Sequence, residues 1–412
     1  MTATLEALEK TGVAVREATA GDTAAGAAPR WVALPESTGE AAALMRACAE
    51  HDLAVVPVGG GTKLRWGRPP ERCDLLVDTR RMNRITEHLA GDMVVRTQAG
   101  VTLGELSRVL AEGGQELALD AAFKGATVGG TLATATAGPR RFRYGTARDL
   151  LIGITVVLAD GTVARSGGKV VKNVAGYDLG KLFTGSYGTL GLITEATFRL
   201  HPLPPLSRWV RLTLPSSGRL QPLALALAAS QAEPAAVELD RPGREGPVEV
   251  AVLVAGVAAD ERAEAMLVMA RAVADVPGTA VSVTREAPGW WGRPPGEEVL
   301  LELRLAPTGL ADALRAVAAW PGAAVRGSMA SVVLQVAVPA GGGAAEFAAR
   351  VTELRAATAR HGGRVVVLAA PAGLAREVDP WGATGAMTLM RRVRERFDPD
   401  RRMSPGRLAG GI

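Results

Sequence analysis

The chain has 412 residues, of which 48% are hydrophobic and 22% charged, a balance typical of globular proteins with two or three domains. Its 47 lysines and arginines barely outnumber 42 acidic residues, and aromatic residues are only 4%, which argues against nucleic-acid binding. No apolar run reaches the ~18 residues that span a bilayer, and the N-terminus lacks the apolar core of a secretory signal. We therefore expect a cytoplasmic protein, or one held at the inner face of the membrane through partners.

The first part of the chain alternates amphipathic helices with apolar strands. Two stretches open with capping-box spacing and continue with helical apolar spacing, which predicts helices over 37–52 and 102–114. Apolar runs bounded by turn residues predict strands over 53–58, 73–79, 84–89 and 93–100. The last two strands should form a hairpin through Ala90-Gly91-Asp92.

Cysteine and histidine are too few and too scattered to predict a metal centre. Cys48 and Cys73 lack the spacing of a zinc site, and the four histidines form no HxH or HExxH pattern. Cys48 falls on the apolar face of the predicted helix, so a buried free thiol is expected. Two cysteines also cannot hold an iron–sulfur cluster.

A glycine-rich segment, 125–191, holds 14 of the chain's 49 glycines. These glycines lie beside strongly apolar strands, one pair of which turns at Asp160-Gly161. A short helix near 177–183 and a strand ending at Leu200 follow. Glycine beside strands indicates that another group approaches the backbone closely here.

The remainder of the chain repeats one order of elements. Pro202, Pro204 and Pro205 mark a boundary, after which the predicted order is βαββαβ twice, the order of ferredoxin-like units. The two units would lie side by side, with one continuous antiparallel sheet. A final helix over 384–398 leads into the C-terminal tail.

The triplet Gly59-Gly60-Gly61 closes an apolar strand and allows several interpretations. A Rossmann turn requires a helix next, which Pro69-Pro70 forbids. The Gly-Lys pairs elsewhere lack the hydroxyl residue of a P-loop. A tight turn remains, as does a nest of backbone N–H groups that, with the Thr62 hydroxyl, could hold the diphosphate of a dinucleotide.

Longer motifs carry a resemblance to a known family. The strings "PVGGGTK", "GATVGGTLAT", "GGKVVKNVAGYDL" and "TGSYGTLGLITEATFRLHP" resemble the PCMH-type FAD-binding domain of the vanillyl-alcohol oxidase superfamily, and in detail the FAD-binding subunits of bacterial glycolate oxidases. The resemblance covers roughly 25–205 and returns in the tail "RFDPDRRMSPGRL". It implies an α+β fold with FAD bound across two subdomains, about 25–90 and 91–205. An antiparallel-sheet cap domain of ferredoxin-like type over 206–370 would follow, and a helix and tail over 371–412 would return to the FAD domain.

Site residues follow from the same resemblance. It implies that FAD is bound by Pro57, Val58, Gly59, Gly60, Gly61 and Thr62 around the diphosphate, by Thr127, Val128, Gly129, Gly130 and Thr134 along diphosphate and flavin, by Gly138 and Gly145 at the turn flanking the isoalloxazine, and by Gly191 and Ile193 at the adenine–ribose end. Arg407 would approach the flavin side.

Departures from the family pattern shape the expected function. Thr62 stands where members with covalent flavin carry histidine, so non-covalent FAD is expected. Ser404 replaces the usual asparagine of the tail, and the second domain has one histidine, His361, so no catalytic base can be named. The resemblance implies an FAD-binding subunit that oxidises 2-hydroxy acids, glycolate to glyoxylate, together with a catalytic flavoprotein subunit and an iron–sulfur subunit. A self-sufficient 2-hydroxy-acid dehydrogenase and a non-catalytic scaffold are the alternatives.

The basic string "GPRRFRYG", 138–145, has two interpretations. Its arginines could bind a substrate carboxylate, since arginine does so through two parallel hydrogen bonds. They could equally contact FAD phosphate or a partner subunit, the interpretation we favour. Tyr144 would be a flavin neighbour or a packed side chain.

Overall fold

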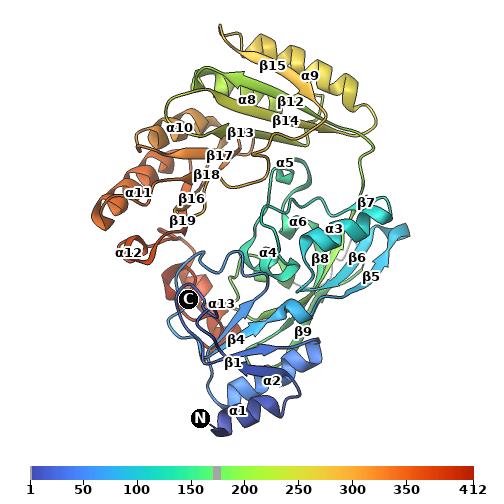
Figure 1. The fold of residues 1–412 in the computed structure, drawn as a ribbon, viewed down its shortest axis with the longest axis vertical. Helices are drawn as coiled ribbons and strands as arrows, with labels where there is room; N and C mark the ends of the chain where they lie inside the picture. The colour runs from blue at the N-terminus through green and yellow to red at the C-terminus, as the bar shows by residue number, and fades with distance from the viewer. Residues whose placement is uncertain (1, 170–177) are drawn as a thin grey trace. The chain divides into compact units, whose positions relative to one another are not determined.

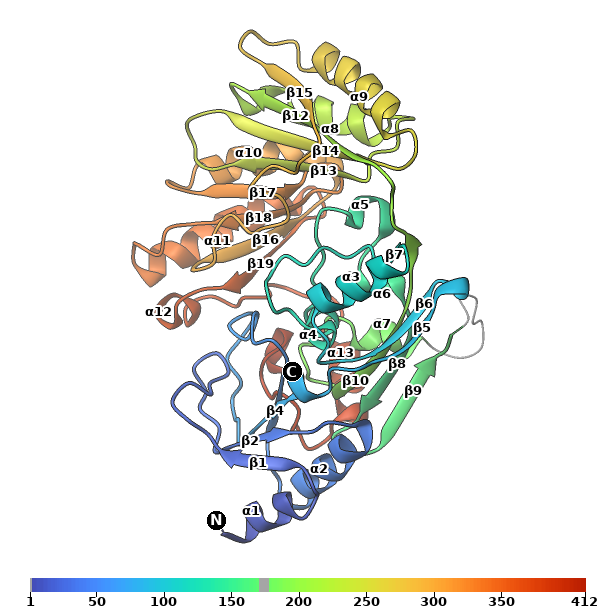
Figure 2. The same ribbon diagram turned by 45° about the vertical axis from the view of Figure 1, so that its right-hand side comes forward.

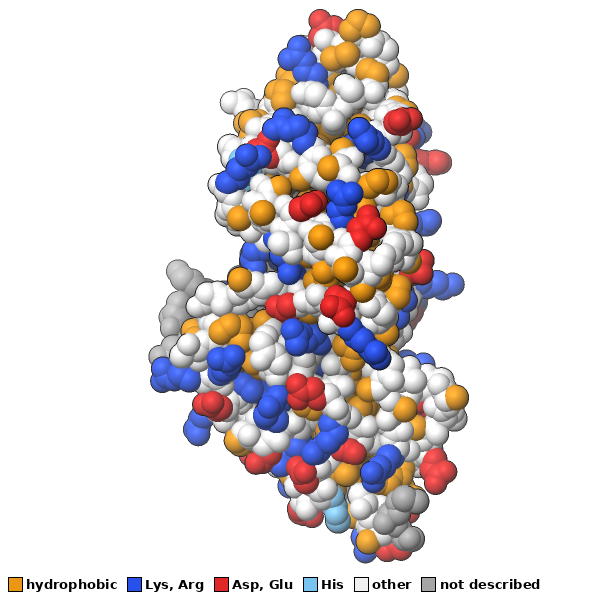
Figure 3. Space-filling model, turned by 90° about the vertical axis from the view of Figure 1, so that its left-hand side faces the viewer, with side chains coloured by type: hydrophobic (Ala, Val, Ile, Leu, Met, Phe, Trp, Pro, Cys, Tyr) orange, Lys and Arg blue, Asp and Glu red, His pale blue; other side chains and the backbone are white. Residues whose placement is uncertain are grey.

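The computed structural model describes residues 2–169 and 178–412, so the motif at 167–179 lies largely outside the described residues. The chain separates into two compact units (Figure 1). Unit 1 comprises Met1–Ala137, Gly145–Leu203 and Ala383–Ile412, and unit 2 comprises Gly138–Tyr144 and Pro204–Gly382. Acidic and basic side chains are interspersed over the face in Figure 3, as the near balance of charges leads one to expect.

A four-stranded sheet opens unit 1, in the order β1-β2-β4-β3. Its strands are β1 (Ala14–Glu17), β2 (Trp31–Leu34), β3 (Val55–Val58) and β4 (Leu75–Asp78). β2, β4 and β3 run parallel, because α2 (Thr38–Glu50) provides the crossover. The predicted capping box is present, since the Ser37 hydroxyl accepts a hydrogen bond from the Glu40 amide. α1 (Thr2–Glu9) packs beside α2.

The second sheet of unit 1 is antiparallel, in the order β5-β6-β10-β8-β9. Its strands are β5 (Ile85–Leu89), β6 (Val94–Gln98), β8 (Leu151–Val157), β9 (Val163–Gly167) and β10 (Leu192–Arg199). Both predicted strand pairs, β5 with β6 and β8 with β9, are confirmed. β7 (Gln115–Glu116) pairs with β11 (His201–Pro202).

Helices pack beside this second sheet and complete unit 1. They are α3 (Leu103–Glu112), α4 (Val128–Thr134), α6 (Ala147–Leu150), α7 (Leu179–Phe183) and α13 (Met387–Phe397). The Thr102 hydroxyl caps α3 by accepting from the Glu105 amide, as predicted. Val95, Leu106, Leu132, Phe183 and Phe198 are part of the shared apolar core. α4 thus has one face in this core, which fixes the position of its other residues.

Unit 2 is built on one eight-stranded antiparallel sheet, in the order β15-β12-β14-β13-β17-β18-β16-β19 (Figures 1 and 2). Its strands are β12 (Ser207–Leu214), β13 (Ala236–Arg241), β14 (Val248–Ala255), β15 (Ala280–Thr284), β16 (Leu300–Arg304), β17 (Ala324–Ser328), β18 (Val333–Ala337) and β19 (Arg364–Ala369). The predicted βαββαβ duplication is confirmed, and pairing of β13 with β17 joins the halves into one sheet.

The two faces of this sheet differ in chemistry. Alternate residues such as Val210, Leu239 and Val336 pack under the helices in the core of unit 2. These helices are α8 (Leu220–Ala228), α9 (Ala259–Val273), α10 (Leu310–Ala318) and α11 (Ala344–Ala359). The intervening residues point to the opposite face, which we call the polar face because it carries Arg211, Glu238, Asp240, Glu249, Glu302 and Arg326.

Short elements complete unit 2. α5 (Arg141–Tyr144) contacts β13, and α12 (Ala372–Ala375) contacts α11. Among the helices that the structure describes, none is long and apolar enough to cross a membrane. The α+β fold class with a duplicated antiparallel-sheet domain is therefore confirmed.

Candidate functional site

The glycine triplet leaves β3 and packs directly against the second half of unit 1. A Cβ atom on Gly60 would lie 1.9 Å from the Gly125 carbonyl oxygen, and one on Gly59 would lie 2.2 Å from the Thr127 hydroxyl oxygen. Gly61 has φ +70°, a conformation that glycine adopts without strain. Close packing and backbone conformation therefore explain all three glycines, and no helix follows them, as Pro69-Pro70 predicted.

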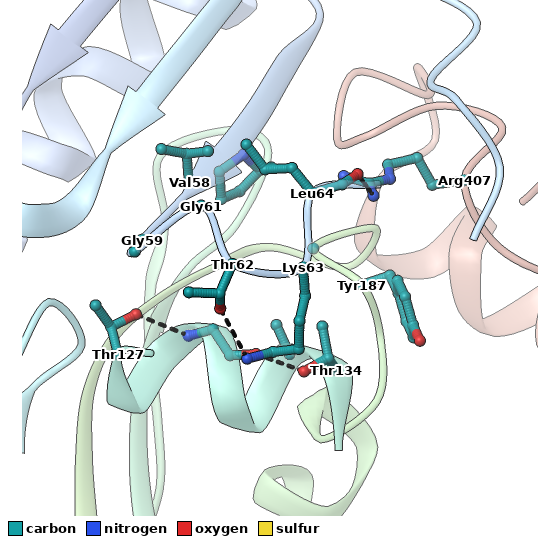
Figure 4. A pocket seen from close by; sticks show the side chains of 15 residues that line it. Val58, Gly59, Gly61, Thr62, Lys63, Leu64, Thr127, Thr134, Tyr187 and Arg407 are labelled. Atoms are coloured by element: carbon teal, nitrogen blue, oxygen red, sulfur yellow. Dashed lines mark hydrogen bonds between the residues drawn. The ribbon is translucent and has the colours of Figure 1, made fainter. Parts of the chain in front are cut away.

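A cavity that is partly open to solvent lies where this loop meets α4 (Figure 4). Its lining comes from the loop after β3, from α4, from the turn before β10 and from the C-terminal tail. The lining residues are Pro57, Val58, Gly59, Gly60, Gly61, Thr62, Lys63, Leu64, Thr127, Gly130, Ala133, Thr134, Tyr187, Gly188 and Arg407. We call residues 59–63 the glycine loop.

Hydrogen-bond donors dominate the polar groups of this cavity. The Lys63 ammonium donates to the Thr62 hydroxyl oxygen at 3.1 Å and lies 5.1 Å from the centre of the Phe123 ring. The Thr134 hydroxyl donates to the Gly130 carbonyl at 2.7 Å. No carboxylate is among the described residues that line the cavity. This donor set fits an anion.

Lys63 is a buried residue of the cavity wall, with 6% of its surface exposed. Burial lowers the pKa of its amine to about 8, because a charged ammonium loses hydration there. In Figure 4 its side chain runs from the glycine loop toward the helix that carries Thr134. The amine therefore lies inside the cavity and does not extend into bulk solvent.

The C-terminal tail holds the far side of the glycine loop. The Arg407 guanidinium donates to the carbonyl oxygens of Leu64 at 2.7 Å and Trp66 at 2.8 Å. The tail is itself fixed to β3, since the Ser404 amide donates to the Val55 carbonyl at 2.8 Å. Burial lowers the pKa of Arg407, and its hydrogen bonds to these two carbonyls hold the segment that follows the glycine loop in place.

Buried Asp398 organises the start of this tail. Its carboxylate accepts hydrogen bonds from the Arg402 and Met403 amides and pairs with Arg394 at 2.9 Å. The acid is fully buried, so these bonds replace the hydration that it loses. Residues 397–407 therefore form a folded segment around Asp398, and this segment is hydrogen-bonded to β3.

The structure brings nine of the fifteen sequence-predicted site residues together at the cavity. Those nine are Pro57, Val58, Gly59, Gly60, Gly61, Thr62, Thr127, Gly130 and Thr134. The sequence did not predict five further lining residues, which are Lys63, Leu64, Ala133, Tyr187 and Gly188. Lys63 stands two residues after the triplet, next to the predicted Thr62.

The other six predicted residues lie elsewhere. Val128 and Ile193 are part of the apolar core, and a Cβ atom on Gly129 would lie 2.8 Å from that of Ala99. Gly191 adopts φ +158° beside the Val157 carbonyl oxygen. Their roles toward FAD stay predictions, as do those of two further glycines. Gly138 belongs to unit 2, and Gly145 has φ +80° in unit 1.

The basic segment 138–144, which we call the strap, is part of unit 2. Arg143 donates to the Glu233 carbonyl at 2.9 Å and pairs with the Glu233 carboxylate at 3.2 Å. Tyr144 packs against the small apolar cluster of Ala235 and Leu253. Tyr144 is therefore a packed side chain, its role toward the flavin stays a prediction, and Arg143 has a partner within its own unit.

A comparison with known families bears on the cavity. A family model described as FAD binding domain matches residues 29–167. This range contains the glycine loop and all of α4. This part of the chain is therefore similar to an FAD-binding domain. The diphosphate of FAD is an anion, and the donor set of the cavity suits it.

A solved structure covers most of the chain. The crystal structure of p-cresol methylhydroxylase with substrate bound is 16% identical, has a TM-score of 0.70 and covers 93% of this chain and 89% of that chain. At this identity the likeness shows the fold alone. The chain has the PCMH-type FAD-binding fold, as the resemblance predicted.

Curated relatives match the FAD-binding part. Glycolate oxidase subunit GlcD of Bacillus subtilis is 39% identical over 177 residues, 43% of this chain and 38% of that protein. D-lactate dehydrogenase [cytochrome] 1 of Saccharomyces cerevisiae, a mitochondrial protein, is 35% identical over 179 residues, 43% of this chain and 30% of that protein. The chain thus matches well under half the length of either relative.

Proposed function

We propose that the cavity beside the glycine loop binds the diphosphate of a non-covalent FAD. The single observation that carries the proposal is a lining with hydrogen-bond donors and a buried lysine but no carboxylate, most of it within residues 29–167 that match the FAD binding domain. The amides of the glycine loop and the Thr62 hydroxyl would donate to phosphate oxygens. Thr62 offers no imidazole for a covalent bond to the flavin, which supports the non-covalent mode.

We propose further that the chain takes part in the oxidation of 2-hydroxy acids. FAD, when bound, would supply the redox chemistry by which a 2-hydroxy acid loses two electrons and two protons to become a 2-oxo acid, and the chain would supply binding and position. The names of the two relatives, a glycolate oxidase subunit and a D-lactate dehydrogenase, support this substrate class. None of the four histidines is among the residues that line the cavity.

The arrangement in the cell is part of the same proposal. The chain would be the FAD-binding subunit of a glycolate oxidase-type complex, with a catalytic flavoprotein subunit and an iron–sulfur subunit, at the inner face of the membrane through those partners. The likeness to a protein named as a subunit supports this version. A self-sufficient dehydrogenase is the second candidate, which the likeness to D-lactate dehydrogenase favours.

One experiment tests these proposals together. The purified chain is reconstituted with FAD, precipitated with acid, and its supernatant examined for flavin. Non-covalent binding predicts that all flavin is released. The reconstituted chain then receives glycolate or D-lactate without oxygen. Bleaching of the flavin band by the chain alone supports the self-sufficient dehydrogenase, and bleaching only with partner subunits supports the complex. A chain that never retains FAD contradicts both.

A further inference from the structure

Lys63 is a buried cation with too few partners among the residues around it. An ammonium has three N–H donors, and the described residues offer its nitrogen one acceptor, the Thr62 hydroxyl, and one aromatic face, that of Phe123. No acidic residue among those described forms an ion pair with it. A buried charge without a counter-charge destabilises a folded protein, so such a residue points to a ligand that supplies the charge.

The direction of the side chain narrows the place of that ligand. Lys63 follows Gly61 and Thr62 in the glycine loop, and its amine lies between the loop and α4, as Figure 4 shows. Arg407 and Tyr187 are the other titratable residues that line the cavity within the described part of the chain. Arg407 adds positive charge, and neither residue supplies a carboxylate. The missing partner is therefore an anion inside the cavity.

We propose that the Lys63 ammonium binds the diphosphate of FAD directly, as a side-chain cation added to the backbone donors of the glycine loop. This inference rests on the proposed function, since it assigns the anion to FAD. An ammonium is a compact charge that can donate to oxygens of both phosphates, whereas backbone N–H groups contribute only partial charges. Lys63 would thus set how strongly, and at which pH, FAD is held.

Proton linkage gives the proposal a second consequence. The Lys63 pKa is about 8 in the free chain, and a neighbouring diphosphate raises it, because the anion favours the charged amine. Below pH 8 the free chain already carries the proton, and FAD affinity should be flat. Above pH 8 binding must take up a proton, so affinity should fall by up to about tenfold per pH unit. Tyr187 and Arg407 are the other titratable groups of the lining, so the Lys63 variants decide whether the fall belongs to Lys63.

The test is an FAD titration of the purified full chain, followed by quenching of flavin fluorescence between pH 7 and 9. Lys63→Met should weaken FAD binding about 10- to 100-fold at pH 7, the range expected for one hydrogen bond to a charged group, and should remove the fall above pH 8. Lys63→Arg should stay within about threefold of wild type and lose the pH dependence, because arginine remains charged. Lys124→Met is the matched control, since Lys124 is exposed and is not among the lining residues, and it should change nothing.

Folding and the cofactor assignment are separated by two further measurements. Lys63→Met without FAD should unfold at the same or a higher temperature than wild type, because a poorly hydrated charge has been removed. Inorganic pyrophosphate should compete with FAD for wild type and not for Lys63→Met. If wild type binds FAD and Lys63→Met binds it equally tightly, the role of Lys63 is wrong while the cofactor proposal stands. If wild type binds no FAD, both are wrong.

Discussion

Lys63 in unit 1 and Arg326 in unit 2 are both largely buried cations, and their surroundings differ. The Arg326 guanidinium pairs with the Asp240 carboxylate at 2.7 Å, lies over the Trp290 ring at 5.7 Å, and donates to the carbonyls of Arg293 and Pro294. Lys63 has a hydroxyl and a ring face, and no carboxylate among the described residues around it.

The polar face of the sheet extends this contrast. Arg211 pairs with Glu249 at 3.2 Å, and the Trp290 indole N–H donates to the same carboxylate at 2.8 Å. The strap follows the same rule, since Arg143 pairs with Glu233. These arginines of unit 2 therefore have acidic partners within the protein. A single lysine without one is the stronger indication of an anion site.

The largest expected effect concerns the packing of the glycine loop. Gly60→Ala places a Cβ atom 1.9 Å from the Gly125 carbonyl oxygen, so backbone must move. We expect a loss of about 3 kcal/mol in the free energy of unfolding, measured by urea denaturation. Gly39→Ala, in α2 with no close neighbour except the Ser37 hydroxyl, is the control and should gain about 0.5 to 1 kcal/mol. Equal stability of Gly60→Ala and wild type would mean that the loop does not pack on Gly125.

Arg326→Met removes the cation of the buried ion pair in unit 2. It leaves the Asp240 carboxyl buried without its cation, and we expect a loss of about 2 kcal/mol at pH 7. Burial already raises the pKa of Asp240, and Arg326 opposes that rise, so the variant pKa should be higher still. The carboxyl then takes up a proton at a higher pH than in wild type, and the stability deficit of the variant should shrink as the pH falls. A deficit that grows on acidification would contradict the assignment, and FAD affinity should be unchanged throughout.

Arg143→Ala tests the strap at its exposed end. The ion pair with Glu233 is largely solvated, so the free energy of unfolding should change by less than about 1 kcal/mol. FAD affinity should stay within twofold of wild type, because Arg143 serves unit 2. A large loss of FAD affinity, measured by the same fluorescence titration, would show that Arg143 contributes to FAD binding.

The smallest expected effect concerns the two cysteines, whose thiols should not react in the native chain. Burial raises the pKa of the Cys48 and Cys73 thiols to about 12, so neither should react with a thiol reagent at pH 8 in the native chain. Both should react after unfolding in urea. Lys63→Met and Arg143→Ala should leave the thiols silent, and Gly60→Ala should speed their reaction. Rapid labelling of native wild type would show that unit 1 opens readily.

Local patterns were enough to predict much of the fold. Capping at Ser37 and Thr102, the hairpin turn at Ala90-Gly91-Asp92 and the alternation in both halves of the sheet depend on neighbouring residues, and all are observed. The buried free thiol predicted at Cys48 is also observed. Such features need no knowledge of distant contacts.

Contacts between distant segments could not be predicted in the same way. The Gly60 contact with Gly125, the hold of Arg407 on Leu64, and the membership of the strap in unit 2 all join residues far apart in the chain. Lys63 could not be singled out as a ligand residue, because a lysine two residues after a glycine triplet matches no known binding motif. Only its burial, and the absence of an acid among the described residues lining the cavity, mark it.

The central claim is that the cavity of unit 1 recognises the diphosphate of FAD. The most direct test compares the dissociation constants of FAD and riboflavin, which share the flavin and differ in the phosphates and adenosine, for the purified wild-type chain at pH 7. The account predicts that FAD binds at least about 100-fold more tightly than riboflavin, and that excess pyrophosphate removes most of that advantage. Equal affinities for FAD and riboflavin, or an FAD affinity that pyrophosphate leaves unchanged, would contradict it.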